Sequence, residues 1–198
     1  MELLINTILV AMTALFLENT IFTRAIGTST MLLAAKNKNG IIPFGLSITY
    51  ICTLSSMLTF VADKFLLNKE YSNLFMPIVY VGIVGIVYII TLLAMWKWKY
   101  DLFSKVKKFI HISAFNCAVL GCLFLNSKES DTLLGYVIFG LFTGLGFFLA
   151  SFLVSVSYEK LNSKEMPKAF RGFPGTMIYI GILSMVFFVL NGFSIPKI

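Results

Sequence analysis

An asparagine and a cysteine, Asn116 and Cys117, stand together inside a hydrophobic stretch of this chain. The interior of a bilayer penalises an unpaired amide, so a polar pair at this place indicates a site rather than a lipid-facing surface. A thiol next to the amide adds the chemistry of metal ligation or of electron transfer. This pair is the first candidate for a functional site.

A second polar pair, Glu18 and Asn19, lies near the end of the first hydrophobic stretch. A charged side chain in the membrane costs at least about 2.5–3.5 kcal/mol unless it is paired or hydrated. Glu18 therefore has two interpretations. It belongs to an ion path or a subunit contact, or the helix ends near Leu17 and Glu18 pairs with Arg24 at the headgroups.

The roles of Asn19, Asn116 and Asp63 each have two interpretations. Asn19 and Asn116 either hold helices together through hydrogen bonds or satisfy backbone groups that a break in the helix exposes. Asp63 either pairs with Lys64 or Lys69 or marks an ion entrance, and the sequence favours the pairing.

The three cysteines are Cys52, Cys117 and Cys122, and they form no CxxC pair and no disulfide framework. Cys117 and Cys122 are separated by roughly 140° around a helix, so they cannot face one metal ion together. Cys52 and Cys122 are interpreted as packing residues. The sequence contains no set of residues typical of soluble hydrolases, phosphate-binding loops or zinc sites.

The elements that position these residues are hydrophobic spans. The chain has 198 residues, of which 58% are hydrophobic and 13% are charged, which indicates an integral membrane protein. Since about 20 residues of α-helix cross the hydrocarbon core, the sequence predicts an all-α fold with six transmembrane helices. The predicted spans are 3–22, 40–62, 74–96, 109–125, 132–157 and 173–194.

The basic residues predict the orientation of these spans. Of the 16 Lys and Arg residues, twelve lie in the connections after the first, third and fifth spans. Loops rich in Lys and Arg remain in the cytoplasm. The distribution therefore places both termini outside.

The two halves of the chain resemble each other, as residues 1–100 and 101–198 of a single membrane domain. A shift of 95 residues places Phe44-Gly45 on Phe139-Gly140, and a shift of 97 places Asn19 on Asn116. Each half has three predicted spans, so the halves enter the membrane from opposite sides as an inverted repeat. Short or interrupted spans at equivalent positions form the site in such folds, and here these are the first and fourth spans.

Several motifs resemble those of one family. They are NCAVLG at 116–121, PKAFRG at 167–172, the Glu18-Asn19 pair and the stretch from Arg24 to Gly27. Together they resemble the Rnf/Nqr family of membrane subunits, which occur in the Rnf (Rsx) electron-transport complex and in the sodium-pumping NADH:quinone oxidoreductase. The resemblance covers essentially the whole chain.

The resemblance implies a six-helix inverted-repeat subunit that pairs with a homologous subunit of opposite topology. It also implies a [2Fe–2S] cluster shared between the two subunits, to which each gives two cysteines. One family cysteine falls on Cys117, and the other falls on Ser29, where this chain has a hydroxyl. A thiolate is the ligand that iron–sulfur clusters need. The resemblance places Asn19, Gly27 and Asn116 around the cofactor.

These observations lead to one functional hypothesis and one alternative. We expect a non-autonomous subunit of a translocating oxidoreductase, in the bacterial cytoplasmic membrane, that helps to carry electrons coupled to Na⁺ or H⁺ movement. Its partners would be the homologous subunit and others that carry flavin or iron–sulfur groups. The alternative is a transporter, channel or scaffold subunit that has lost the iron–sulfur site.

Overall fold

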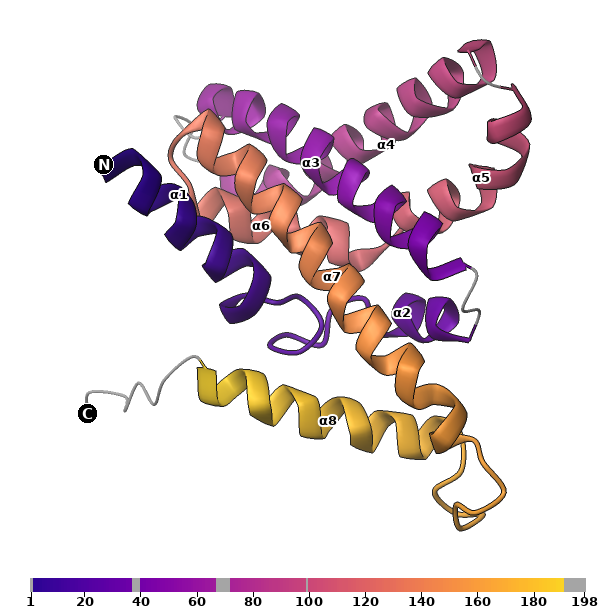
Figure 1. The fold of residues 1–198 in the computed structure, drawn as a ribbon. Coiled ribbons are helices and arrows are strands. Elements are labelled where there is room, and N and C mark those ends of the chain that lie inside the picture. Colours follow the sequence, from indigo (N-terminus) through magenta and orange to yellow (C-terminus); the bar gives the residue numbers. More distant parts are fainter. Residues whose placement is uncertain (1, 37–39, 67–71, 99, 191–198) are drawn as a thin grey trace, which may run out of the picture.

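The computed structural model describes residues 2–36, 40–66, 72–98 and 100–190, and these residues form helices and no strand (Figure 1). The all-α class is thereby confirmed. In chain order the elements are α1 (Glu2–Met12), the π-helix η1 (Thr13–Leu17), α2 (Thr28–Ala35), α3 (Ile41–Leu66), α4 (Ser72–Trp98), α5 (Tyr100–Ala114), α6 (Cys117–Glu129), α7 (Leu133–Leu161) and α8 (Phe173–Leu190).

Long apolar helices dominate the described part of the chain. There, α3, α4 and α7 are long and apolar enough to cross a membrane, and the bent pair α5–α6 forms a fourth candidate span. The apolar segments 7–17 and 173–189 are shorter. The helices agree with a protein that crosses the membrane several times.

The predicted spans correspond to the helices in two different ways. Spans two, three, five and six each correspond to one helix, namely α3, α4, α7 and α8. Spans 3–22 and 109–125 are both interrupted: the first ends at η1, and the second is bent by 50° between α5 and α6. The sequence analysis missed α2 as a separate helix and the first turns of α5, whose lysines lowered the hydropathy.

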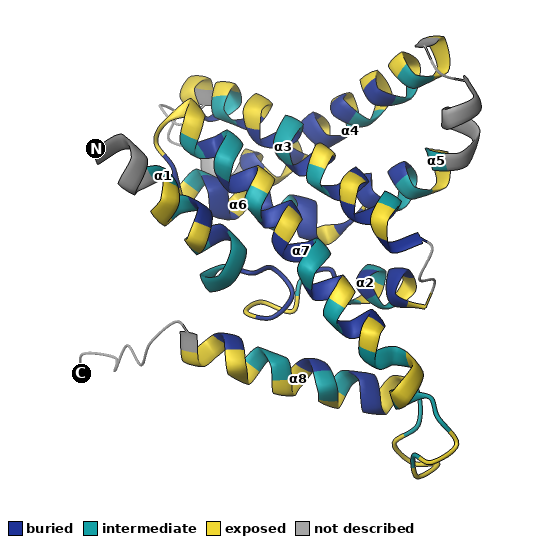
Figure 2. Ribbon diagram, in the orientation of Figure 1, coloured by how far each residue is buried: buried dark blue, intermediate teal, exposed yellow. Residues whose placement is uncertain are grey.

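Helices α3 and α7 form the centre of the molecule and lie side by side (Figure 1). Small residues allow this close approach, as is usual where membrane helices meet. A Cβ atom on Gly144 would lie 2.4 Å from Cα of Thr49, and one on Gly140 would lie 2.9 Å from the carbonyl oxygen of Cys52. Figure 2 shows the buried faces of both helices turned towards each other and towards α6.

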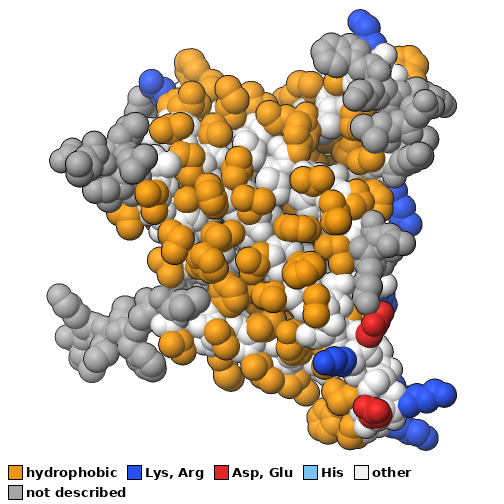
Figure 3. Space-filling model, viewed as in Figure 1, with side chains coloured by type: hydrophobic (Ala, Val, Ile, Leu, Met, Phe, Trp, Pro, Cys, Tyr) orange, Lys and Arg blue, Asp and Glu red, His pale blue; other side chains and the backbone are white. Residues whose placement is uncertain are grey.

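Helix α8 covers the end of the first interrupted span. The ring of Phe187 lies 4.4 Å from that of Phe22 and 6.2 Å from that of Phe16, measured between centroids. Exposed apolar side chains cover most of the face drawn in Figure 3. Such a surface suits contact with lipid or with other membrane subunits.

Candidate functional site

The first interruption of the chain begins where η1 ends. The amide of Glu18 donates to the carbonyl of Thr13 at 2.7 Å, which closes the π-helical turn. The backbone then turns through residues 18–27, with positive φ at Ala25 (56°) and Gly27 (86°). A π-helical turn followed by left-handed residues ends the helix and allows α2 to start in a new direction.

Asn19 satisfies the backbone groups that this interruption exposes. Its Oδ1 accepts from the amides of Ile21 and Phe22, at 3.1 and 3.2 Å. Its Nδ2 donates to the carbonyl of Leu15 at 3.0 Å and to the carbonyl of Gly146 in α7 at 3.2 Å. The side chain, which is 1% exposed, therefore fulfils both roles considered for it: it satisfies the broken backbone and joins it to α7.

Glu18 pairs with Arg24 on the surface of the same turn. Its Oε2 lies 2.7 Å from Nη2 of Arg24 and accepts a hydrogen bond from Nε at 2.8 Å. The two side chains are 23% and 45% exposed. Of the two interpretations of Glu18, the structure gives the pairing with Arg24, and the helix ends at Leu17 as that interpretation requires.

The second interruption lies between α5 and α6, and Asn116 forms it. The backbone of Asn116 is extended, and its Oδ1 accepts from the amide of Ala118 at 3.0 Å, which caps the start of α6. The residue is 1% exposed, and its Nδ2 has no hydrogen-bond partner among the residues that the structure describes. An unpaired buried amide is costly, so this nitrogen is an open donor at the start of a half-helix.

The two interruptions meet at Gly27. A Cβ atom there would lie 3.1 Å from Oδ1 of Asn116 and 2.8 Å from Cβ of Ala118. Only glycine combines this closeness with the positive φ of the position. The start of α2 and the start of α6 are therefore in contact.

Cys117 is the first residue of α6 and is exposed. It lines a cavity of about 250 Å³ whose walls are mostly apolar and come from α4, α5 and α6. Tyr88 and Phe115 are among its neighbours there. The thiol is accessible from the side of the molecule that α4 and α5 form.

Ser29 lies in the first turn of α2 and is also exposed. It lines a different cavity, of about 470 Å³, together with Tyr158, Asn162 and Thr176. Cys117 comes directly after Asn116 in the chain, and Ser29 comes two residues after Gly27. Although Asn116 and Gly27 are in contact, Cys117 and Ser29 line separate cavities.

The other two cysteines come together away from Cys117, which the sequence analysis missed. Cys52 of α3 and Cys122 of α6 are fully buried, and the two thiols interact electrostatically with each other. Sγ of Cys122 also lies 3.9 Å from Oγ of Ser56. Only their place on two neighbouring helices joins them, so no spacing in the sequence could reveal the pair.

The donor set at the two interruptions does not match a two-cysteine contribution to a [2Fe–2S] cluster. Cys117 is the one thiol there, because Cys52 and Cys122 are buried inside the helix bundle. Among the described residues, no three His, Cys, Asp or Glu side chains gather in a group that could hold a metal ion. A cluster of this type needs four soft ligands, of which this chain offers one at the matching positions.

Asp63 lies in a second polar centre, between α3, α4 and α7. It is 2% exposed, and its two carboxylate oxygens accept hydrogen bonds from the hydroxyls of Tyr80 (2.8 Å) and Tyr136 (2.7 Å). Of the two lysines considered as partners of Asp63, Lys64 does not pair with it: its ammonium lies over the ring of Phe60, 5.9 Å from the centroid. The alternative partner Lys69 lies outside the described residues.

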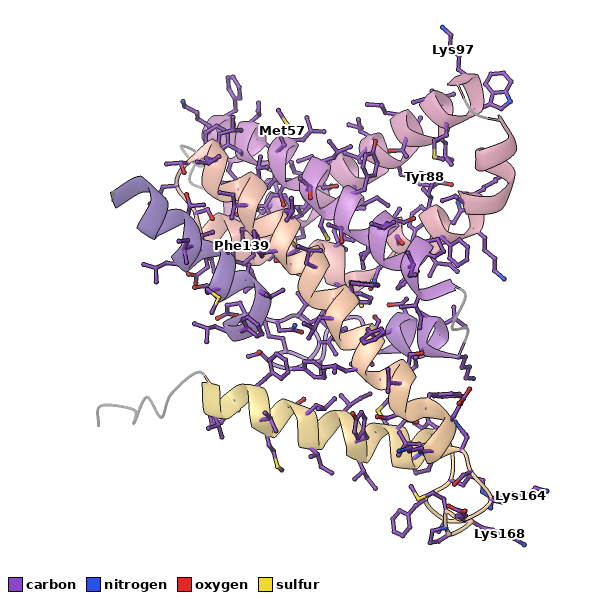
Figure 4. All side chains as sticks on the ribbon, in the orientation of Figure 1. Met57, Tyr88, Lys97, Phe139, Lys164 and Lys168 are labelled. Carbon is purple, nitrogen blue, oxygen red and sulfur yellow. The ribbon has the colours of Figure 1, made fainter. Side chains whose placement is uncertain are left out.

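A third polar contact joins α4 to α5. The hydroxyl of Tyr88 and Nδ1 of His111 form a hydrogen bond, and the centroids of the two rings are 5.2 Å apart. Figure 4 shows Tyr88 in the space between these helices. His111 thus fixes the last turns of α5 that precede Asn116.

Comparison with known proteins gives a consistent result. A family model described as "Rnf-Nqr subunit, membrane protein" matches residues 7–194. The A subunit of an ion-translocating oxidoreductase complex from Histophilus somni strain 2336 is 25% identical over 189 residues, which are 96% of this chain and 98% of that protein. The A subunit of the Na⁺-translocating ferredoxin:NAD⁺ oxidoreductase complex from Acetobacterium woodii is 23% identical over 188 residues, 95% of this chain and 98% of that protein. The resemblance that the motifs indicate is confirmed.

Proposed function

Because this chain belongs to the Rnf-Nqr family of membrane subunits, we propose that it is a non-autonomous subunit of an ion-translocating electron-transport complex. Its relatives are named as subunits of such complexes, and one of them is named for Na⁺ translocation. The subunit works in the bacterial cytoplasmic membrane and helps to carry electrons across it, coupled to the movement of Na⁺ or H⁺. Flavin- or iron–sulfur-carrying subunits complete the complex.

The observation that carries this proposal is the contact of the two interrupted helices at Gly27. It brings Asn116, with its open amide donor, and the exposed Cys117 to one place at the start of α6. Half-helices that meet in this way form the binding sites of inverted-repeat membrane proteins. Since Cys117 faces outward, a second subunit can reach it.

The order of the helices supports an inverted repeat of three spans each. An interrupted span is followed by two longer helices in both halves, namely α1–η1–α2, α3 and α4, and then α5–α6, α7 and α8. Three spans per half require that the halves cross the membrane in opposite directions. As the family resemblance implies, we propose a homologous six-helix subunit of opposite topology as the partner.

The positions of the basic residues support termini on the outside. Lys97, Lys164 and Lys168 all lie at one end of the molecule in Figure 4, at the right of the view, whereas α1 begins and α8 ends at the other side. The lysine-rich end is the cytoplasmic end by the positive-inside rule.

In this proposal the chain contributes Cys117 alone to an iron–sulfur site whose remaining ligands come from the partner. Such a cluster would supply one-electron transfer, and the chain's own residues would position it: Asn116 by capping the half-helix, and Gly27 by admitting the neighbouring backbone. Ser29 favours a second candidate function, that of a scaffold or transport subunit without a cluster.

Iron and acid-labile sulfide, measured on the complex purified with its native partners, separate the two candidates. We expect iron and sulfide in the wild type, their loss in Cys117→Ser, and their retention in Cys122→Ala, the matched buried cysteine. In Ser29→Cys, which adds a thiol at the matching position, iron occupancy should rise. An intact complex without iron in both the wild type and Ser29→Cys would establish the scaffold or transport function instead.

A further inference from the structure

The structure places an acidic side chain in the interior of the helix bundle, one turn before the end of α3. Asp63 accepts from one hydroxyl of α4 and one of α7, so three helices converge on a single carboxylate. The two tyrosine rings are themselves held in place, Tyr80 against Phe124 and Tyr136 against Phe60, with centroids 5.0 and 5.4 Å apart. Hydrogen bonds and ring contacts from three helices therefore hold the carboxylate in a fixed position.

Further oxygen atoms lie around the backbone of Tyr136. Asn126, which is fully buried, donates from Nδ2 to the carbonyl of Tyr136 at 2.9 Å. Its Oδ1, and Oγ of the buried Ser130, have no hydrogen-bond partner among the described residues. The carboxylate and hydroxyl oxygens that meet at Asp63 are themselves of the kind that hard cations prefer.

A line of buried polar residues continues from Asp63 along one face of α3. Thr59, Ser56, Ser55 and Cys52 follow at helical spacing, and each is at most 1% exposed. Oγ of Ser55, and Oγ1 of Thr143 on the facing α7, have no partner among the described residues. Polar residues inside membrane helices mark ion paths and proton relays, so this line gives the carboxylate a polar connection towards the middle of the bundle.

We propose that Asp63 is a reversible binding site for a small monovalent cation, H⁺ or Na⁺, enclosed by Tyr80 and Tyr136. The proposal rests on the proposed function, in which the complex moves one of these ions. Both ions neutralise the carboxylate: a proton binds one oxygen as O–H, and Na⁺ binds the deprotonated carboxylate, so the two compete.

The titratable and charged groups near the carboxylate decide how a measurement of ion binding at Asp63 is interpreted. Tyr80 faces it from α4 and Tyr136 from α7; Asp131 acts electrostatically on the Tyr136 hydroxyl from the α6–α7 connection. On the side of α3, Lys64 is the next residue, and Lys69 follows outside the described residues. Lys69 is the group whose pairing with Asp63 would make the site a fixed ion pair.

The first measurement is the infrared band of the protonated carboxyl group, followed against pH on the full chain in lipid nanodiscs, in NaCl and in choline chloride at equal ionic strength. A titrating band that is absent in Asp63→Asn establishes the site. A midpoint at lower pH in NaCl than in choline identifies Na⁺ as a competing ligand, and equal midpoints identify the proton alone. The exposed Asp131→Asn is the matched control and keeps the band.

Two conservative variants keep the proposal testable even if Asp63→Asn does not fold. Tyr80→Phe and Tyr136→Phe each remove one hydrogen bond to the carboxylate but keep Asp63 itself, so the Asp63-dependent band should persist in both. Where Na⁺ binds, saturating NaCl should raise the thermal midpoint of the wild type by roughly 5–10 °C over choline. Asp63→Asn should lose that shift.

Two results would overturn the proposal. One is the absence of any Asp63-dependent band and of any Na⁺-dependent thermal shift in a folded wild type. The other is a Lys69→Gln variant as unstable as Asp63→Asn, with no further loss in the double variant, because that would show a fixed ion pair. Neither result affects the iron assay, so failure of this site and failure of the proposed function are distinguishable.

Discussion

Asn19 and Asn116 occupy equivalent places in the two halves but differ in their hydrogen bonds. Asn19 makes four, two to amides within the interruption and two to carbonyls, one of η1 and one of α7. Within the described part of the chain, the Asn116 side chain makes one and leaves its Nδ2 without a partner. The first asparagine is therefore saturated by the fold, and the second retains a donor for a ligand or a partner.

Replacing Asn19 should destabilise the protein strongly. Asn19→Ala leaves two buried amides, one buried carbonyl and one partly buried carbonyl without this partner, which should cost about 2–4 kcal/mol. The measurement is the thermal or denaturant midpoint of the purified protein in detergent.

The matched control is Thr23→Ala in the same turn. The Thr23 hydroxyl donates to the carbonyl of Leu17 at 3.0 Å on the exposed side, so its loss should cost less than about 1 kcal/mol. Equal effects of the two substitutions would contradict the role given to Asn19.

Among the elements, α3 and α7 decide the geometry of the bundle. They carry polar and small residues where they face each other, and the two sets of buried polar groups are arranged around them: the cysteine pair with α6, and Asp63 with α4. A change in the distance between α3 and α7 would alter both the surroundings of the cysteine pair and those of Asp63.

Substitution of Gly144 should separate α3 from α7. In Gly144→Ala the new methyl group would lie 2.4 Å from Cα of Thr49, and backbone cannot move aside as a flexible side chain can. Overpacking of this kind costs roughly 1–3 kcal/mol. Thermal unfolding in detergent, together with the yield of folded protein, measures the effect.

Gly82 in α4 provides the control. A Cβ atom there meets nothing within 4 Å among its surroundings, and alanine favours a helix more than glycine. Gly82→Ala should be neutral or stabilising in the same assay, and a loss like that of Gly144→Ala would refute the argument from close approach.

At the scale of the whole molecule, the unequal distribution of lysines predicts the orientation in the membrane. Alkaline phosphatase is active only outside the cytoplasm, and green fluorescent protein fluoresces only inside it. Fusion of phosphatase after the last residue should give an active enzyme, and a fluorescent protein inserted after Ser163, in the α7–α8 connection, should fluoresce. The reverse pattern would contradict the orientation.

Much of the helical architecture was predictable because hydropathy acts over whole segments. The spans at α3, α4 and α7 followed from composition alone, and the interruptions at Asn19 and Asn116 followed from polar residues inside apolar stretches. The bounds of α2 and α5 did not, because a short half-helix and a lysine-rich amphipathic helix give weak hydropathy signals.

Only part of the site could be predicted from the sequence, and the reason is physical. The sequence by itself determined the family, the all-α membrane class and the residues at the two interruptions, since each depends on residue types at local spacing. Only the tertiary structure decided that Asp63 meets two tyrosines rather than Lys64, that Cys52 meets Cys122, and that Cys117 faces outward. Those contacts join helices far apart in the chain, and which faces meet is set by the packing of small residues between α3 and α7, which no local pattern records.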